Sequence, residues 1–328
     1  MTKRREVFRW QGLLLILLLA GDLWSQSDQP KQEQDFTIRT TSRLVLLDVS
    51  VKDPSGGFVS GLTRDNFKIY EDGKPQQISQ FGGADQPVTV GIVVDESGSM
   101  GPKRAEAIAA ALEFIKASNP HDEIFVVNFN EKARRGLPDM VPFSDDVKEL
   151  NKALWRGLPE GRTALYDAVE LSLEQLKMGR RDRKAMVVIS DGGDNVSVHK
   201  WPDVMHDVLD SLVTIYTVGI FDEDDAERDP RVLEKLAHVS GGAAYFPKTI
   251  EEVVPVCRQI AKDVRERYTV GYIPPMEGKS GGDARSGGYA KVVRHVKVEA
   301  LTEDHKKLAI RTRNSYTFEP DTLAVNRK

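Results

Sequence analysis

The stretch Val88–Met100 reads VTVGIVVDESGSM, and the organisation of the whole chain follows from it. Its first part is a continuous apolar run rich in β-branched residues, which is typical of a strand buried on both faces of a parallel sheet. The run then breaks into Asp95-Glu96-Ser97-Gly98-Ser99. Because such sheets place ligand sites in the loops at the carboxyl ends of their strands, this loop is the first candidate for a functional site.

The loop offers one carboxylate and two hydroxyls, on Asp95, Ser97 and Ser99. These are hard oxygen ligands, which suit Mg²⁺, Mn²⁺ or Ca²⁺ better than they suit a soft metal. Gly98 would let the loop turn tightly enough for the three oxygens to converge. An ordinary polar turn, in which the serines cap the following helix, explains the same residues, so this motif alone does not decide between the two.

Two later stretches favour the metal site. Gly161–Asp167 (GRTALYD) places the hydroxyl of Thr163 just before a helical pattern. Val187–Gly193 (VVISDGG) is another buried-strand run, and it ends at Asp191. Both stretches are expected at the same edge of the sheet as the first loop. Thr163 also has a simpler explanation, because Thr caps helices well.

Together these residues resemble the von Willebrand factor A domain and its metal-ion-dependent adhesion site, a D-x-S-x-S motif followed by a Thr and a later Asp. The resemblance covers roughly Pro87 to Arg267. It implies that two serines bind the ion directly, that the two Asp act through water, and that the Thr joins or leaves with conformational state. It also implies an open position for an Asp or Glu of a partner protein. The corresponding metal ligands here are Asp95, Ser97, Ser99, Thr163 and Asp191, and the expected ion is Mg²⁺, with Mn²⁺ or Ca²⁺ as alternatives.

Composition limits the class of protein. The 328 residues are 29% charged and 40% hydrophobic, which is a globular composition, and the net charge of −4 gives no reason to expect a nucleic-acid partner. The single cysteine, Cys257, excludes an intrachain disulfide and is expected to be a small buried hydrophobe. The six histidines show no metal-ligand spacing, and G-x-S-x-G, H-E-x-x-H and phosphate-loop motifs are absent, so we predict that the protein is not an enzyme.

The first residues indicate export. Basic residues precede the apolar core Leu13–Ala20 and a polar segment follows it, as in a secretory signal peptide. The apolar stretch between Arg9 and Asp22 has twelve residues, whereas a spanning helix needs about 20. We therefore expect residues 1–25 to be a signal peptide and residues 26–35 a flexible leader. The mature protein would be secreted, periplasmic or in the cell envelope, with no membrane span after cleavage; retention as an uncleaved anchor is the alternative.

Strand and helix patterns divide the rest of the chain. Over residues 87–267, strand patterns at 123–129, 184–190, 212–221 and 243–246 alternate with helical patterns at 103–118, 163–178, 203–212, 231–239 and 251–267. This alternation predicts an α/β fold with a doubly wound, mainly parallel, Rossmann-like sheet flanked by helices. Residues 36–84 and 268–319 show strand patterns but are each too short to bury a good core. We predict that they pair as one β-sandwich into which the α/β domain is inserted, with residues 320–328 as a tail.

The layout of nearly the whole chain is also similar to a bacterial family of exported VWFA-related domain proteins, described mainly from Acidobacteria. The similarity is carried by the segment Val51–Pro75, by Gly271–Pro274 (GYIP) and by a late R-x-R-x-x-Y that ends at Tyr316. It implies a location and an architecture rather than an activity.

Three features near the expected site have two interpretations each. Phe221–Asp229 (FDEDDAERD) is either a solvated acidic loop or a second cation site at the rim of the first. Asp194-Asn195 either supports the ligands or forms a plain turn. Glu96, in the variable slot of the motif, either tightens the ion or faces solvent.

Two functions from different classes follow. The first is an exported, metal-dependent protein-binding module of the adhesion type, which binds an acidic residue of its partner through Mg²⁺. The second is a structural cell-envelope protein in which the metal only stabilises the fold. A metal-assisted hydrolase ranks below both, because the sequence shows no evident general base beside the site. Binding of an acidic partner only in the presence of Mg²⁺ would separate the first two.

Overall fold

The computed structural model describes residues 44–221, 228–275, 292–302 and 306–318. The predicted signal peptide, leader and tail lie outside the described residues, as do most of the acidic loop and the start of the predicted 36–84 segment. Within the described ranges, no helix has the length and apolar character needed to cross a bilayer.

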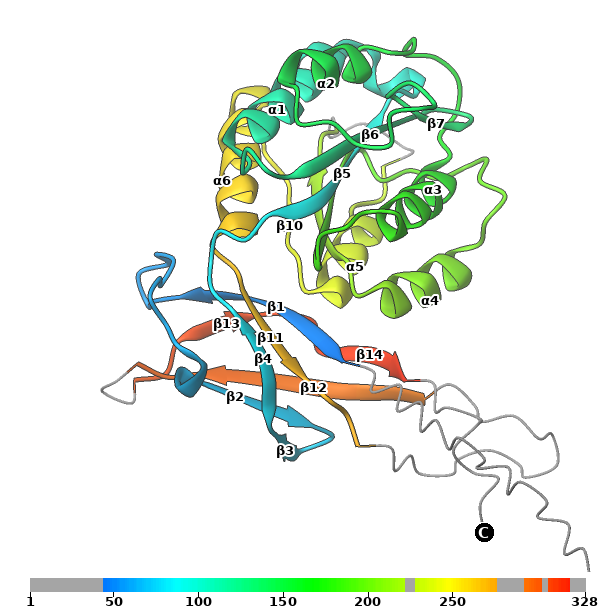
Figure 1. The fold of residues 1–328 in the computed structure, drawn as a ribbon. Coiled ribbons are helices and arrows are strands. Elements are labelled where there is room, and N and C mark those ends of the chain that lie inside the picture. The colour runs from blue at the N-terminus through cyan, green and yellow to red at the C-terminus, as the bar shows by residue number, and fades with distance from the viewer. Residues whose placement is uncertain (1–43, 222–227, 276–291, 303–305, 319–328) are drawn as a thin grey trace, which may run out of the picture. The chain divides into compact units, whose positions relative to one another are not determined.

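A six-stranded sheet forms the centre of the α/β domain, with the order β10-β9-β8-β5-β6-β7 (Figure 1). Its strands are β5 (Val88–Asp95), β6 (Glu123–Phe129), β7 (Ala133–Arg135), β8 (Arg183–Ser190), β9 (Thr214–Gly219) and β10 (Ala244–Tyr245). All eight residues of β5 are buried, as its apolar run predicts. The sheet is parallel except for β7, which pairs antiparallel with β6.

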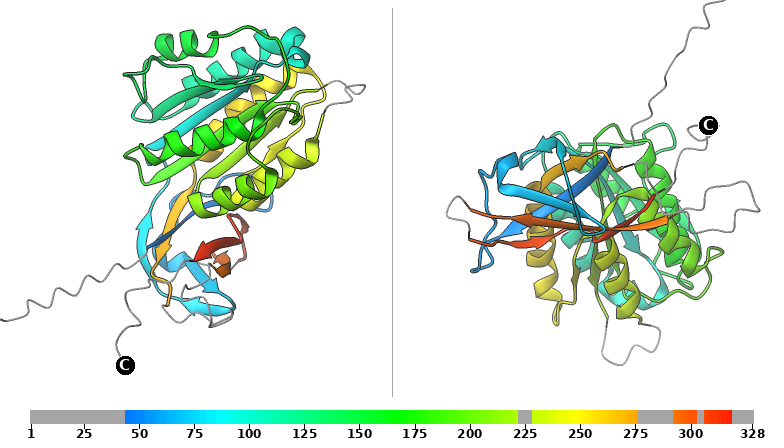
Figure 2. Two further views of the ribbon diagram at one scale, coloured as in Figure 1. Left: turned by 90° about the vertical axis from the view of Figure 1, so that its right-hand side faces the viewer. Right: turned by 90° about the horizontal axis from the view of Figure 1, so that it is seen from below.

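Helices cover both faces of this sheet (Figures 1 and 2). They are α1 (Arg104–Ala117), α2 (Val147–Leu154), α3 (Leu165–Lys177), α4 (Trp201–Ser211), α5 (Pro230–Ser240) and α6 (Val253–Arg265), with the short 3₁₀ helices η2 (Gly98–Lys103) and η3 (Ile250–Glu252). The predicted helices and strands of this domain are confirmed, with ends that shift by a few residues. Strand β7 and helix α2 are additions that the sequence patterns do not predict. Cys257 is confirmed as a core residue of α6, where burial raises the pKa of its thiol to about 12.

The flanking segments form two four-stranded antiparallel sheets, in the orders β13-β1-β11-β4 and β14-β12-β2-β3. Their strands are β1 (Val45–Lys52), β2 (Phe67–Glu71), β3 (Lys74–Gln76), β4 (Ile78–Gly82), β11 (Tyr268–Tyr272), β12 (Val292–Ala300), β13 (Ala309–Arg311) and β14 (Ser315–Phe318), and the 3₁₀ helix η1 (Arg64–Asn66) precedes β2. Each sheet combines strands from before and after the α/β domain, since β1 pairs with β11 and β2 with β12. Residues of both sheets, among them Leu47, Ile69, Val270 and Val298, share one hydrophobic cluster.

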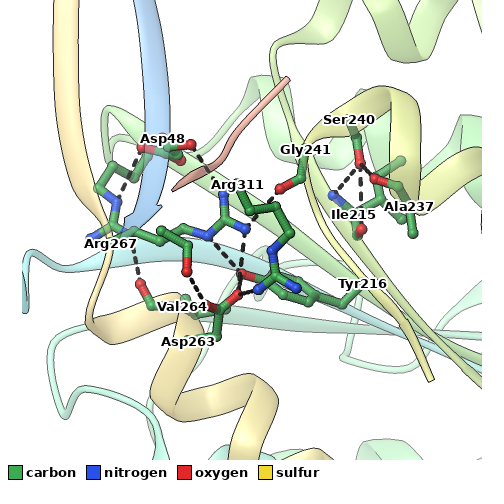
Figure 3. Close-up of polar contacts among 12 residues, drawn as sticks. Asp48, Ile215, Tyr216, Ala237, Ser240, Gly241, Asp263, Val264, Arg267 and Arg311 are labelled. Atoms are coloured by element: carbon green, nitrogen blue, oxygen red, sulfur yellow. Dashed lines mark hydrogen bonds and ion pairs between the residues drawn. The ribbon is translucent and has the colours of Figure 1, made fainter. Parts of the chain in front are cut away.

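A buried polar network joins α6 to strands β1, β9 and β13 (Figure 3). At its centre Asp263, which is 1% exposed, accepts hydrogen bonds from Ser50 Oγ at 2.6 Å and from the Tyr216 hydroxyl at 2.5 Å. The same carboxylate pairs with Arg267 and Arg311. Burial alone would raise the pKa of Asp263, but the two guanidinium groups hold it below the usual value.

Arg267 extends this network along the junction between the α/β domain and the flanking sheets. Its Nε donates to the Tyr216 hydroxyl at 2.8 Å, and its terminal nitrogens donate to the carbonyls of Asp48 at 3.1 Å and Gly241 at 2.8 Å. One side chain therefore contacts β1, β9 and the end of α5. Because these charges are buried and paired, removing one partner leaves the others without compensation.

We expect Asp263→Asn to lower the free energy of unfolding by about 3 kcal/mol at neutral pH, since the buried guanidinium of Arg267 and the partly buried one of Arg311 lose their counter-charge. Urea unfolding followed by tryptophan fluorescence measures this. The control is Glu113→Gln, whose carboxylate pairs with Lys116 and Arg258 at the surface and should leave the unfolding midpoint almost unchanged.

The pH dependence of the same variant gives a second readout. Because the folded-state pKa of Asp263 lies below its ordinary value of 3.8, the wild type gains stability from this group above that value. It loses that contribution as the pH falls through the folded-state pKa, and Asp263→Asn should lack this part of the acid dependence. An Asn variant as stable as the wild type at neutral pH would contradict the role given to this carboxylate.

Candidate metal centre

The carboxyl ends of β5 and β8 form the candidate site. These strands are neighbours in the sheet, but β6, which follows β5 in the chain, lies on the opposite side of β5 from β8. The loops therefore diverge at this point, which is where open α/β sheets leave room for a ligand. Strand β5 ends at Asp95, and β8 ends at Ser190, directly before Asp191.

Four of the five predicted ligands lie in one hydrogen-bonded cluster. Ser99 Oγ donates to Asp191 Oδ2 at 2.5 Å and lies 3.1 Å from Ser97 Oγ. The Ser97 amide donates to Asp95 Oδ1 at 2.8 Å. Asp95, Ser97 and Asp191 are at most 1% exposed, and Ser99 is half-buried. The structure therefore brings these oxygens together, and their binding of an ion stays a prediction.

The loop after β5, residues 95–99, is held in its conformation by close contact with residues 155–164, the connection between α2 and α3. The Gly98 amide donates to the Gly161 carbonyl at 3.0 Å, and a Cβ on Gly98 would lie 3.4 Å from that carbonyl oxygen. Ser97 stands at the N-cap position of η2, yet its side chain makes no capping hydrogen bond. The helix-capping explanation of the Ser97 hydroxyl is therefore wrong.

Thr163, the fifth predicted ligand, is 2% exposed and lies just before α3. Its amide donates to Asn195 Oδ1 at 3.0 Å, and its carbonyl accepts from the Asn195 amide at 3.0 Å. The N-cap position of α3 is Ala164, so the capping explanation of Thr163 is also wrong. Asn195 thus ties the Thr163 loop to the loop that carries Asp191, and it supports the candidate ligands rather than forming a plain turn. Asp194 likewise accepts a hydrogen bond from the Tyr166 amide at 3.2 Å.

Ser190 is a functional candidate that the sequence patterns miss. Its hydroxyl donates to Asp95 Oδ2 at 2.6 Å and accepts from the Gly192 amide at 3.0 Å. Because Ser190 is fully buried and lies on the neighbouring strand, it fixes the second oxygen of the Asp95 carboxylate. The only signal for it in the sequence is its position directly before Asp191.

Glu96 does not face solvent, and its carboxylate pairs with an arginine. The side chain is 1% exposed, and its Oε1 accepts a hydrogen bond from Arg104 Nη2 at 2.8 Å. The same nitrogen of Arg104 donates to the carbonyls of Trp155 at 3.3 Å and Gly157 at 2.9 Å. The guanidinium also lies 5.2 Å from the centre of the Trp155 ring system. Glu96 therefore pairs with the scaffold, away from solvent.

The Glu96–Arg104 pair fastens the connection between α2 and α3 to the first loop. The Glu160 amide adds a hydrogen bond to the Glu96 carbonyl at 3.0 Å. Gly157 has a φ of +155°, and a Cβ there would lie 1.9 Å from Glu96 Oε2. A side chain at this position would displace the Glu96 carboxylate from where it lies. The segment that carries Thr163 is therefore placed by contacts outside the predicted ligand set.

The electrostatics of the cluster fit a divalent cation. Burial, and then the charge of Asp191, raise the pKa of Asp95 to about 7, against the hydrogen bonds from Ser190 and Ser97. Two buried carboxylates and several hydroxyls face one another, and a hard cation would supply the positive charge that they favour. The described residues contain no group of three or more His, Cys, Asp or Glu side chains arranged for a metal, so an ion here would depend on the hydroxyls as well.

Most of the acidic loop after β9 lies outside the described residues, so both of its interpretations stay open. Asp229, at its end, caps α5 by accepting a hydrogen bond from the Arg231 amide at 3.1 Å. Its own amide donates to the Asp191 carbonyl at 3.2 Å. The end of this loop therefore supports the backbone of one predicted ligand.

Comparison with protein families agrees with this arrangement. The model of the von Willebrand factor type A domain matches residues 90–193, from strand β5 to the turn after β8. That segment contains the switch point of the sheet and all five predicted ligands. The chain therefore contains a von Willebrand factor type A domain.

The individual proteins that match this chain have low sequence identity to it. The uncharacterized protein sll0103 of Synechocystis sp. is 27% identical over 183 residues, which cover 53% of this chain and 41% of that protein. A von Willebrand factor type A structure from Catenulispora acidiphila is 14% identical, with a TM-score of 0.47 over 88% of this chain and 78% of its own. Proximal thread matrix protein 1 from the mussel byssus, solved with a zinc-occupied MIDAS motif, is 16% identical, with a TM-score of 0.43 over 55% and 48%. At these scores the two structures add no argument about the site.

We expect Gly157→Ala to lower the free energy of unfolding by about 2 kcal/mol, because the added methyl overlaps Glu96 Oε2 and displaces a buried ion pair. Urea unfolding in the presence of a chelator measures the effect without any contribution from an ion. Gly56→Ala is the matched control, since Gly56 also has a positive φ, +88°, but no atom within 4 Å of an added Cβ. It should lose only about 1 kcal/mol from backbone strain. Equal losses in the two variants would contradict the placement of Glu96.

Proposed function

We propose that this protein is a metal-dependent protein-binding module of the adhesion type that acts outside the cytoplasm. A Mg²⁺ ion, with Mn²⁺ or Ca²⁺ as alternatives, would be bound at the carboxyl ends of β5 and β8, and an Asp or Glu of the partner protein would complete its ligand shell. The observation that carries the proposal is the buried cluster of hydroxyl and carboxylate oxygens there. The proposed ligands are Asp95, Ser97, Ser99, Thr163 and Asp191.

The surroundings of the cluster favour binding over catalysis. A nucleophilic serine needs a base within hydrogen-bonding distance. The Ser97 hydroxyl lies beside that of Ser99, whose own hydroxyl donates to Asp191, and Glu96, the next acid in the loop, is held by Arg104. The imidazole of His199 is bonded to Asp167 at 2.7 Å. Ser99 therefore contacts a carboxylate, but Asp191 is itself a proposed ion ligand, and Glu96 and His199 are bonded to other side chains.

We also propose that the protein is exported, on the basis of the signal-peptide pattern in residues 1–25, and that it belongs with the exported VWFA-related proteins. The two antiparallel sheets would form one β-sandwich into which the α/β domain is inserted. The hydrophobic cluster shared by both sheets and the pairing of β1 with β11 support that arrangement. In this architecture the flanks hold the α/β domain through the Asp263 network.

We expect Asp95→Ala to weaken Mg²⁺ binding by about ten- to a hundredfold, since loss of a charged, hydrogen-bonded group in such a site costs on the order of 1.5–3 kcal/mol. Asp191→Ala should weaken it less, if that carboxylate acts through water. Isothermal titration calorimetry with Mg²⁺ makes the comparison. Asp65→Ala is the control, because Asp65 is exposed in η1, far along the chain from the site. Equal binding by the wild type and Asp95→Ala would mean that the loop is only a turn.

A pull-down from cell-envelope extract, with Mg²⁺ against chelator, separates the two proposed classes of function. Capture of a protein only in Mg²⁺, and not by Asp95→Ala, supports the binding module. A Mg²⁺-dependent rise in Tm without any Mg²⁺-dependent capture supports a structural envelope protein in which the ion only stabilises the fold.

A further inference from the structure

The surface beside the candidate metal centre is built from the β6–β7 turn and the connection between α2 and α3. We call residues 131–135 and 155–162 the rim. Backbone hydrogen bonds hold both segments against the ligand loops, since the Asn130 carbonyl accepts from the Ala164 amide at 2.7 Å and Gly161 accepts from Gly98 at 3.0 Å. The rim therefore begins directly beside Thr163.

The rim is positively charged although the whole chain carries a net charge of −4. Its carboxylates are Glu131 and Glu160, and its cations are Lys132, Arg134, Arg135, Arg156 and Arg162. The Arg162 side chain is 67% exposed and lies 3.8 Å from Glu131, a surface pair too long and too solvated to contribute much. Lys132 and Arg134 are exposed as well. A negatively charged partner can therefore reach several cations next to the ion.

Two apolar side chains are exposed in the same rim. Leu158 is 65% exposed and Trp155 is 48% exposed. The backbone around them is fixed by the hydrogen bonds from Arg104 to the carbonyls of Trp155 and Gly157. An apolar surface that is already held in place binds with little loss of conformational entropy, and Trp is enriched among residues that dominate binding energy.

We propose that the rim is the docking surface for an acidic segment of the partner protein. In that segment, the carboxylate that reaches the ion is flanked by further Asp or Glu residues and by one large apolar residue. The flanking acids would pair with Arg162, Arg134 and Lys132, and the apolar residue would contact Leu158 and Trp155. Complementary charge of this kind raises the association rate and rejects basic segments. The inference rests on the proposed function for the ion-bound carboxylate.

The rim fits a peptide better than a nucleic acid. Single-stranded nucleic acid needs a track of cations and open aromatic faces on which bases stack. Here the carboxylates of Glu131 and Glu160 interrupt the cations, and the Trp155 ring already lies against the Arg104 guanidinium. A short acidic peptide needs only a few cations close to the ion.

Fluorescence anisotropy with the full chain tests the proposal. The probes are fluorescein-labelled Gly-Leu-Asp-Glu-Glu-Gly and Gly-Leu-Asp-Lys-Lys-Gly, which share the apolar residue and the ion-binding carboxylate. In Mg²⁺ at low salt, we expect the acidic peptide to bind at least about fivefold more tightly, with the difference shrinking as salt is added. Equal or tighter binding of the lysine peptide would overturn the proposal.

A rim variant and a charge-matched control test whether the rim cations cause the preference for the acidic peptide. The triple variant Lys132→Gln, Arg134→Gln, Arg162→Gln should bind the acidic peptide at least about fivefold more weakly, while calorimetry shows that Mg²⁺ binds at least as tightly as in the wild type, since the variant removes only positive charge. The control, Lys68→Gln, Lys74→Gln, Lys307→Gln, removes the same charge from exposed positions in the flanking segments and should bind the peptide like the wild type. Undiminished binding by the rim variant would overturn the proposal.

Other outcomes separate this inference from the proposed function. If neither peptide binds although Mg²⁺ does, both the rim and the acidic partner are contradicted. If Mg²⁺ does not bind, but the acidic peptide binds and the rim variant loses it, the metal-dependent function fails and the rim stands. Phosphatidylglycerol vesicles or an oligothymidylate that bind the rim more tightly than the acidic peptide would overturn the peptide assignment.

Discussion

Asp95 places a carboxylate at the end of a strand in which every residue is buried, and the surrounding loops are arranged around that charge. Burial disfavours an ionised group unless hydrogen bonds or an opposite charge compensate. The Ser97 amide and the Ser190 hydroxyl each bond one oxygen of this carboxylate. Those two bonds require the first loop to curl and β8 to lie beside β5. The Ser99–Asp191 contact then follows from the same geometry, so the constraint that stabilises Asp95 also gathers the oxygens that an ion needs.

The adjacent carboxylate, on Glu96, has its own counter-charge. Arg104 neutralises it and at the same time holds the connection that leads to Thr163. The two neighbouring carboxylates of this loop therefore have different roles. Asp95 faces the ligand cluster, whereas Glu96 holds the neighbouring segment in place. The same principle acts at the junction with the flanking sheets, where Asp263 is buried but paired with two arginines. In both places a buried charge fixes which segments lie together.

The parts of the fold that the sequence predicts are the segments with a clear pattern of hydrophobic residues. Strands such as β6 and β8 are continuous apolar runs, which is the pattern of a strand buried on both faces. Strand β7 is only Ala-Arg-Arg and pairs through its tertiary context, so it has no such pattern. Helix α2 does have buried residues at helical spacing, Leu150, Ala153 and Leu154, and an N-cap at Asp146, but its eight residues give only about two turns of that pattern. The cluster around Asp95 is likewise predictable because its motif is local. Ser190 and the Glu96–Arg104 pair are not, since a lone strand-end serine has no signature and the pair depends on a backbone approach at Gly157.

The central claim, that these oxygens hold a divalent ion, is tested most directly by anomalous diffraction from crystals grown in Mn²⁺. The account predicts one anomalous peak at the carboxyl ends of β5 and β8, about 2.2 Å from the hydroxyl oxygens of Ser97 and Ser99. The peak should disappear when Mn²⁺ is replaced by a chelator. Crystals that contain Mn²⁺ elsewhere but show no peak between Ser97, Ser99 and Asp191 would contradict it.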